Sequence, residues 1–185
     1  MQNVNWSEIN SKLPVGKNKE DSEQRKKLCK SIDGNGNGYL SLAETDKGVR
    51  DVLGLDNVFD CKSAINKAFH AAKQKYASKS KYGADYLELM EFRFFLVYLR
   101  QFFEYYVMFD KLDLTGDKKV GLEEFKQAIP TVEKWGAKIT DAEATFNEIS
   151  QGDGGLTYTE FCDWAIKLNL DLEDDDDIDS SEQLK

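Results

Sequence analysis

The sequence predicts an all-α fold: four helix–loop–helix units in two paired lobes, with a short two-stranded pairing between the loops of each pair. Glutamates follow short polar stretches four times, at intervals of 47, 33 and 36 residues: Glu44, Glu91, Glu124 and Glu160. An apolar residue stands four positions before each of them: Leu40, Leu87, Val120 and Leu156. Only two prolines occur, so few residues interrupt helices. Internal repetition of this kind is typical of a repeated supersecondary unit.

In the first half of the chain, apolar spacing predicts short amphipathic helices. Trp6, Ile9 and Leu13 stand at i, i+3 and i+7, which predicts a helix over residues 5–13. Further helices are predicted over residues 20–32, 43–54 and 57–76, and a polar loop over 77–86. The last of these helices contains AINKAFHAAKQKY, a strong helix former by residue propensity.

Residues 87–112 form the most apolar segment, LELMEFRFFLVYLRQFFEYYVMFDKL. It has no glycine or proline, and apolar residues cover most of its helical circumference, which predicts a buried helix. Its charged residues interrupt it too often for a membrane span. A second interpretation is that its aromatic residues 92–109 form a surface that becomes available to a partner. Later helices are predicted over residues 122–134, 141–149 and 158–168.

The net charge of −9 over 185 residues is concentrated at the end of the chain. Residues 171–185 contain eight acids and one lysine. A nucleic-acid-binding protein would present a basic face, so we expect no such partner. We expect the acidic end to be disordered, with a weak cation-binding role or an electrostatic arm toward a basic partner as alternatives.

Three cysteines stand far apart, without the spacing of a zinc site, so we expect reduced, buried thiols in a cytoplasmic protein. The start, MQNVNWSEIN, lacks the pattern of a secretory signal. Gln2 stands where a myristoylated glycine would be needed, so we expect no membrane anchor of that kind, and no segment predicts a transmembrane helix.

Four regions are expected along the chain. They are an N-terminal helix or arm (1–19), a first loop pair (20–98), a second loop pair (99–169) and an acidic tail (170–185).

The first polar stretch, DGNGNGYLSLAE, matches the needs of a calcium ion at every position of a twelve-residue loop (loop one, 33–44). Calcium takes about seven oxygens, from short side chains at positions 1, 3 and 5, a carbonyl at 7, often a water at 9, and a bidentate glutamate at 12. Position 6 is a glycine, here Gly38, because the backbone turns there with positive φ. The expected ligands are Asp33, Asn35, Asn37, Tyr39 through its carbonyl, Ser41 and Glu44. A phosphate-binding loop would need a preceding strand and a Gly-Lys-Ser/Thr sequence, which are missing.

Loop two (80–91) and loop three (113–124) keep the closing glutamate but depart from this pattern. Loop two has Tyr82 and Ala84 at positions 3 and 5 and Asp85 at position 6, so we expect it to bind no calcium and to support loop one by pairing Leu87 with Leu40. In loop three the expected ligands are Asp113, Thr115, Asp117, Lys119 through its carbonyl, and Glu124. Lys118 stands where glycine is expected, and forcing it into a left-handed turn costs about 1 kcal/mol. The alternative for loop three is a purely structural role.

Loop four (150–160) is one residue short. Counting twelve back from Glu160 reaches Ile149, and starting at Ser150 gives eleven residues, so position 1 has no carboxylate in either case. We expect loop four to be a structural partner of loop three. The alternative is a rearranged site that uses Asp153 and Glu160.

With four such units identified, the sequence resembles the EF-hand superfamily and, more narrowly, the calflagins, which are the flagellar calcium-binding proteins of trypanosomatids. The resemblance spans about residues 25–168 and is carried by MEFRFFLVYLRQFFEYYVMFD (90–110), LEEFKQAIPTVEKWGAKITDAEATFNEI (122–149) and TEFCDWAI (159–166). It implies a calcium-dependent switch that associates with flagellar or membrane structures through N-terminal acylation. Gln2 and the short loop four depart from the family pattern.

The leading hypothesis is a calcium sensor, in which calcium changes helix packing and exposes an aromatic surface to an unknown protein target. A calcium buffer is the near alternative. A third class is a photoprotein-like or ligand-carrying EF-hand protein, and a fourth is a static structural partner. The single histidine, His70, lies at an ordinary helix position, and no nucleophile with a matching base is recognisable, so we expect no enzyme.

Overall fold

The computed structural model describes residues 4–75 and 81–172. The described chain is helical, with two short antiparallel strand pairs, which confirms the predicted fold class. It divides into two compact units, an N-terminal unit of Asn5–Phe103 and a C-terminal unit that begins at Glu104. The sequence predicts this boundary at residues 98–99 and a separate arm over residues 1–19.

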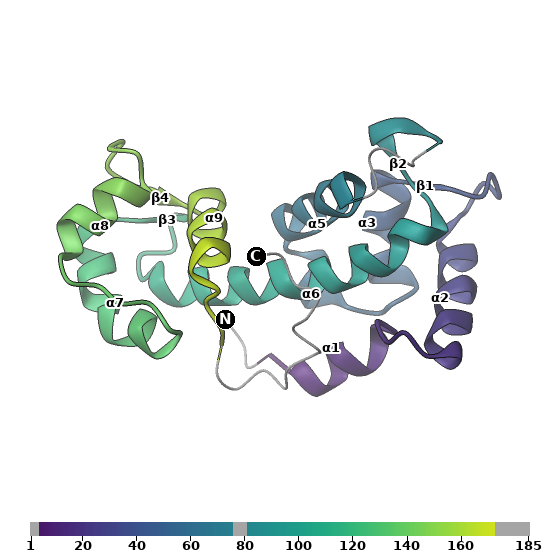
Figure 1. Ribbon diagram of the computed structural model, residues 1–185, viewed down its shortest axis with the longest axis horizontal. Helices are drawn as coiled ribbons and strands as arrows, with labels where there is room; N and C mark the ends of the chain where they lie inside the picture. The colour runs from purple at the N-terminus through teal and green to yellow at the C-terminus, as the bar shows by residue number, and fades with distance from the viewer. Residues whose placement is uncertain (1–3, 76–80, 173–185) are drawn as a thin grey trace. The chain divides into compact units, whose positions relative to one another are not determined.

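The N-terminal unit contains two helix–loop–helix hands (Figure 1). Its elements are α1 (Trp6–Lys12), α2 (Lys19–Ile32), β1 (Leu40–Ser41), α3 (Leu42–Asp51), α4 (Asp56–Phe59), α5 (Lys62–Lys75), the 3₁₀ turn η1 (Gly83–Asp85), β2 (Tyr86–Leu87) and the first part of α6 (Leu89–Leu112).

Short polar residues fix where these helices begin. The Asn5, Asn18 and Ser41 side chains accept backbone N–H groups at the starts of α1, α2 and α3. The predicted apolar stripe of α1 is buried, and the Trp6 ring lies 5.6 Å from that of Phe103. N-caps of this type each contribute about 1 kcal/mol to helix stability.

The predicted single helix over residues 57–76 is wrong: α4 and α5 are separated at Asp60 and Cys61. The Cys61 backbone N–H donates to Val58, and the Cys61 thiol donates to the Asn57 carbonyl at 3.3 Å. After the break, the Lys62 ammonium lies 2.9 Å from the centroid of the Phe59 ring and 2.9 Å from Asp46 Oδ1. These tertiary contacts outweigh the helix propensity of the segment.

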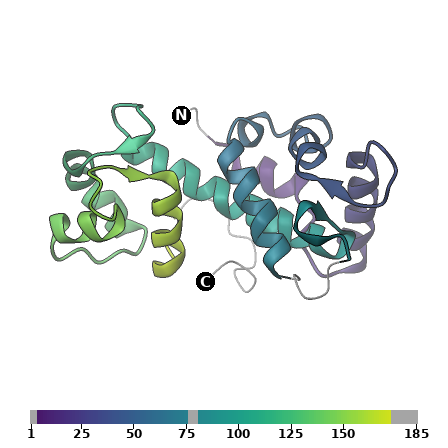
Figure 2. The same cartoon turned by 90° about the horizontal axis from the view of Figure 1, so that it is seen from above.

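Helix α6 is one uninterrupted helix, as Figures 1 and 2 show, and it contributes its first part to one unit and its last part to the other. Its aromatic residues form much of the core of each unit: Phe92, Phe95, Tyr98, Phe102, Phe103, Tyr105 and Phe109 are all buried. This confirms the prediction of a buried helix. No helix in the described ranges is long and apolar enough to cross a membrane.

The C-terminal unit also contains two hands. Its elements after α6 are β3 (Lys119–Val120), α7 (Leu122–Lys134), α8 (Ala142–Ile149), β4 (Leu156–Thr157) and α9 (Tyr158–Leu168). Phe125 packs against Phe146 and Trp164, with ring centroids 5.7 and 6.0 Å apart. Helix α9 ends at Asn169, which takes a left-handed conformation with φ 53°.

Each unit joins its two loops by a strand pair. β1 pairs with β2 so that Leu40 faces Leu87, and β3 pairs with β4 so that Val120 faces Leu156. The predicted pairing of Leu40 with Leu87 is therefore confirmed, and all four apolar residues are fully buried. The loops of a pair are thus coupled through backbone hydrogen bonds and a shared apolar contact.

Most of the predicted acidic tail, Gln2 and the start of loop two lie outside the described residues.

Candidate metal sites

Loop one joins α2 to α3 and turns tightly around the Asp33 side chain. Asp33 Oδ1 accepts the backbone N–H of Gly36 at 2.9 Å, and Oδ2 accepts that of Gly38 at 2.8 Å. Gly36 and Gly38 have φ of 72° and 88°, values that residues other than glycine rarely adopt. Farther along, Asn37 Oδ1 accepts the N–H of Tyr39 at 3.0 Å. These bonds fold the loop backbone around the side-chain oxygens of Asp33 and Asn37, at positions 1 and 5.

Glu44 closes loop one from the first turn of α3. Its Oε2 accepts the Ser41 backbone N–H at 3.0 Å, and its own backbone N–H donates to the Ser41 hydroxyl oxygen at 3.2 Å, a capping box that fixes the start of the helix. Its Oε1 accepts the Asn35 side-chain amide at 2.9 Å. The structure therefore brings position 12 against position 3, as the predicted site requires.

Loop three repeats the three hydrogen bonds just described for Asp33 and Asn37, which we call the hydrogen-bond frame of the loop. Asp113 Oδ1 accepts the N–H of Gly116 at 2.8 Å, and Oδ2 accepts that of Lys118 at 2.9 Å. Asp117 Oδ1 accepts the N–H of Lys119 at 2.9 Å. Lys118 has φ of 68°, which confirms that a lysine takes the left-handed position that glycine fills in loop one.

Glu124 closes loop three as Glu44 closes loop one. Its Oε1 accepts the Thr115 N–H at 2.9 Å, and its Oε2 accepts the Gly121 N–H at 2.7 Å. Burial raises the pKa of Glu124, but the hydrogen bonds from Gly121 and Thr115 outweigh it, so the pKa lies below its ordinary value. The carboxylate is therefore held in its charged form, which is the form that binds a cation.

The donors of both loops suit a hard cation rather than zinc. Among the described residues, no three His, Cys, Asp or Glu side chains gather closely enough to hold a metal by themselves. Loops one and three add amide, hydroxyl and backbone carbonyl oxygens to their carboxylates, and such mixed oxygen sets are what calcium takes. The residues present thus fit calcium, and sulfur and imidazole ligands take no part.

The closing glutamate of loop two has a different partner. Glu91 is fully buried, and its two oxygens accept hydrogen bonds from the Lys73 ammonium at 2.8 and 2.7 Å. Glu91 Oε2 also accepts the Glu88 backbone N–H at 2.8 Å. A lysine of α5 therefore supplies the positive charge to which the carboxylate binds.

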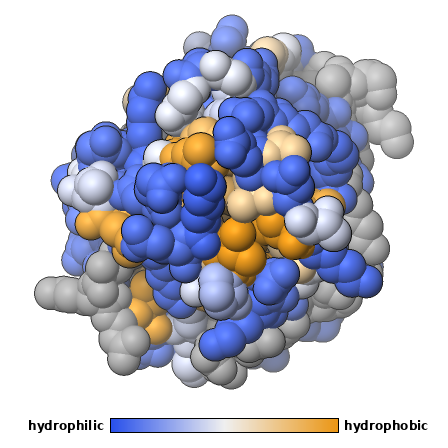
Figure 3. All heavy atoms as spheres, turned by 90° about the vertical axis from the view of Figure 1, so that its left-hand side faces the viewer, coloured by the Kyte–Doolittle hydropathy of each residue, from blue (hydrophilic) through white to orange (hydrophobic). Residues whose placement is uncertain are grey.

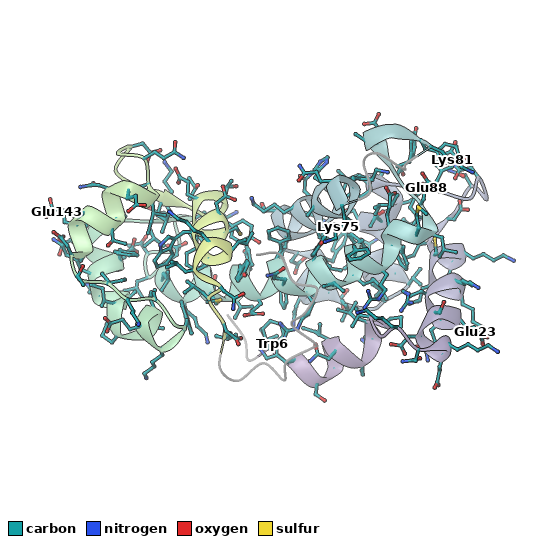
Figure 4. All side chains as sticks on the ribbon, viewed as in Figure 1. Trp6, Glu23, Lys75, Lys81, Glu88 and Glu143 are labelled. Atoms are coloured by element: carbon teal, nitrogen blue, oxygen red, sulfur yellow. The ribbon has the colours of Figure 1, made fainter. Side chains whose placement is uncertain are left out.

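The rest of loop two lacks carboxylates directed as in loop one. The Glu88 carboxylate accepts the Lys81 backbone N–H at 2.7 Å, and Figure 4 shows these two residues near each other at the loop. Positions 3 and 5 are Tyr82 and Ala84, and neither side chain carries a carboxylate. The Tyr82 ring packs on that of Tyr39 in loop one, with centroids 4.4 Å apart. The geometry is that of a support for loop one.

Loop four keeps the hydrogen bond at position 5 and the closing glutamate, but it has no aspartate at its start. Asp153 Oδ1 accepts the N–H of Gly155 at 3.1 Å, so Asp153 takes the place of Asn37 and Asp117 at position 5. Glu160 forms a capping box with Thr157, as Glu44 does with Ser41. The first residue after α8 is Ser150, which is buried and whose hydroxyl has no hydrogen-bond partner. A hydroxyl therefore stands where the other two loops have the Asp33 and Asp113 carboxylates.

Sequence reasoning missed Lys73. It lies four residues after Phe69 and eight after Ile65, on the apolar face of α5, and its side chain is buried. A lysine that continues an apolar stripe is a signal that a buried acid lies opposite, since a buried charge needs a partner.

The comparisons with known proteins agree with the loop geometry. A family model described as the FCaBP EF-hand domain matches residues 9–99. A flagellar calcium-binding protein of Trypanosoma cruzi is 37% identical over 175 residues, which are 93% of this chain and 83% of that protein. The flagellar calcium-binding protein TB-24 of Trypanosoma brucei brucei is 37% identical over 177 residues, 94% of this chain and 81% of that protein.

Among solved structures, a homologue of programmed cell death 6 protein from Leishmania major Friedlin matches with a TM-score of 0.42 at 15% identity, covering 85% of this chain and 79% of that one.

Proposed function

The chain belongs to the family of flagellar calcium-binding proteins, and from that premise we propose that it binds calcium at loops one and three and acts as a calcium sensor. The observation that supports this most is the hydrogen-bond frame that the two loops share. In each, the aspartate at position 1 accepts the N–H groups of positions 4 and 6, and the glutamate at position 12 meets position 3.

The proposed ligands are the oxygen-bearing residues that the loop pattern predicts. They are Asp33, Asn35, Asn37, Tyr39, Ser41 and Glu44 in loop one, and Asp113, Thr115, Asp117, Lys119 and Glu124 in loop three. A calcium ion held by these oxygens would supply positive charge that offsets the carboxylates. Loops two and four support their neighbours through the strand pairs.

Calorimetric titration of the full chain tests the assignment. We expect two calcium ions per chain, one after Glu44→Gln or Glu124→Gln, and none after both, because each substitution removes the bidentate carboxylate of one loop. Glu123→Gln is the matched control, since Glu123 is exposed beside Glu124 and pairs with Lys126 instead. Calcium binding that survives the combined Glu44→Gln and Glu124→Gln substitutions would show that the ions bind outside loops one and three.

The sensor role depends on apolar surface that calcium makes accessible. Most aromatic residues of α6 are buried in the structure, so a target reaches them only if the helices of a hand move apart. The C-terminal unit also presents apolar side chains: Leu114 and Leu168 are exposed, and Figure 3 shows hydrophobic side chains near the centre of its face within a hydrophilic surround. Such a surface suits a protein target.

A hydrophobic dye separates a sensor from a buffer. We expect its fluorescence to rise as calcium saturates the full chain, and to rise less for Glu44→Gln and for Glu124→Gln, because each substitution removes calcium from one of the two units. A signal that stays flat through saturation would identify a buffer.

The relatives are named for the flagellum, and we propose the same location for this chain, which a fluorescent fusion in a flagellated cell would test.

A further inference from the structure

A groove of about 560 Å³ lies in the N-terminal unit, outside the calcium ligands. Residues from α2, both loops of the unit and the start of α6 form its walls. Gly38 of loop one, Tyr82 of loop two, and Met90 and Arg93 of α6 are among the residues that line it.

The groove collects exposed apolar side chains. Tyr82, Leu89 and Met90 line it and are 47%, 42% and 50% exposed. With Tyr86 they make up four of the six large apolar side chains that are exposed in the described part of the chain. So dense a cluster of exposed apolar side chains within nine residues indicates a surface that another segment covers.

The charged residues of the groove are mostly basic. Arg25, Lys26 and Arg93 line it, against one acid, Glu88. The two guanidinium groups are held in place by neutral acceptors: Arg25 donates to the carbonyls of Pro14 and Gly16 at 2.6 and 2.7 Å, and Arg93 donates to that of Val15 at 2.6 Å. These bonds position both guanidinium groups at the groove, in a chain whose net charge is −9.

We propose that the occupant of this groove is the chain's own acidic segment, residues 173–185. Seven of these thirteen residues are acidic and one is basic, and Ile178 stands between Asp177 and Asp179. An apolar residue flanked by carboxylates complements apolar walls with a basic rim. Because the segment is tethered to the same chain, its effective concentration at the groove is far above that of a free peptide. A target with an acidic, apolar segment would have to displace it.

Zero-length carbodiimide cross-linking of the full chain, followed by mass spectrometry, tests this docking. The reagent joins an ammonium to a carboxylate only when they are in contact. We expect Lys26 to cross-link to carboxylates of residues 173–182, and Lys30 to do so far less. Lys30 is the matched control because it is also exposed on α2, but it does not line the groove.

Three further arms make the result specific. We expect Ile178→Ser and Met90→Ser each to reduce the Lys26 cross-link, and about 1 M sodium chloride, where the Debye length is about 3 Å, to abolish it. Equal labelling of Lys26 and Lys30, or a Lys26 cross-link that neither substitution changes, would overturn the proposal. A mixture of isotopically light and heavy protein identifies the source: cross-links within one isotope support it, and mixed-isotope cross-links would instead assign the groove to a second copy.

Discussion

The Lys73 ammonium lies 2.8 and 2.7 Å from the two carboxylate oxygens of Glu91, and both side chains are buried. Lys73 belongs to α5, which enters loop two, and Glu91 belongs to α6, which leaves it. The pair therefore joins the two helices of the second hand at the position where a calcium-binding hand would use the metal. Its presence explains why loop two keeps a closing glutamate while lacking the other ligands.

Lys73→Met is expected to destabilise the protein by about 3–5 kcal/mol, because it leaves the buried Glu91 carboxylate without its cation. Adding Glu91→Met to the same chain should recover most of the loss, since the buried charge is then gone. Urea unfolding without calcium measures both changes. The control is Lys167→Met, which breaks an exposed pair with Glu148 and should cost about 0–1 kcal/mol. If the single and double variants lose equal free energy of unfolding, the unpaired Glu91 charge is not the cause of the loss.

Gly48→Ala should destabilise the first hand, although alanine favours helices. An added Cβ would lie 2.7 Å from Ile32 Cγ1, where α3 meets the end of α2. Overpacking of this kind costs about 1–3 kcal/mol, against a propensity gain of at most about 1 kcal/mol. Gly34→Ala is the control, because no heavy atom lies within 4 Å of its added Cβ. If urea unfolding shows that Gly48→Ala is the more stable variant, the helices are less tightly packed than described.

Lys118→Gly should stabilise the C-terminal unit by up to about 1 kcal/mol, because glycine takes the positive φ of this position without a Cβ clash. The reciprocal change in loop one, Gly38→Lys, should cost a similar amount, since φ there is 88°. Thermal unfolding of the calcium-free variants compares the two. A destabilising Lys118→Gly would mean that the lysine side chain contributes more than its backbone strain costs.

Burial, and then the charge of Asp33, raise the pKa of the Cys29 thiol from 9.0 to about 11. The folded state thus holds this proton more tightly than the unfolded state, so the stability it contributes is complete below pH 9 and is lost as the pH rises through about 11. Alkylation of Cys29 in the folded protein should be slow at pH 8 and rise toward pH 11. Peptide mass spectrometry identifies the labelled site, and rapid labelling of Cys29 at pH 8 would contradict the buried thiol.

Local sequence patterns predicted most of the fold because they encode local physics. The spacing of Trp6, Ile9 and Leu13 gave a helix with a buried face, and the repeated apolar position gave the pairing of Leu40 with Leu87. The left-handed backbone of Lys118 followed from its position in the loop alone. In each case the residues that determine the structure lie within about a dozen positions of one another, or occupy the same position in each repeated loop.

Features that depend on contacts between distant elements were not predictable in the same way. The break between α4 and α5 involves Lys62 reaching Phe59 and Asp46, which helix propensity does not encode. The ion pair of Lys73 with Glu91 joins residues eighteen positions apart across loop two. The placement of Ser150 at the start of loop four required knowing where α8 ends.

Whether loops one and three bind calcium while loops two and four do not can be measured loop by loop, in a residue-resolved nuclear magnetic resonance titration of the full chain. The backbone amides at position 6 report each loop: Asp85, Gly38, Lys118 and Gly154. Gly38 and Lys118 donate to the aspartates at position 1, so their resonances should shift and saturate with calcium. Those of Asp85 and Gly154 should show no separate binding step. A separate binding step at Gly154 or Asp85, or resonances of Gly38 and Lys118 that stay unchanged, would contradict this assignment.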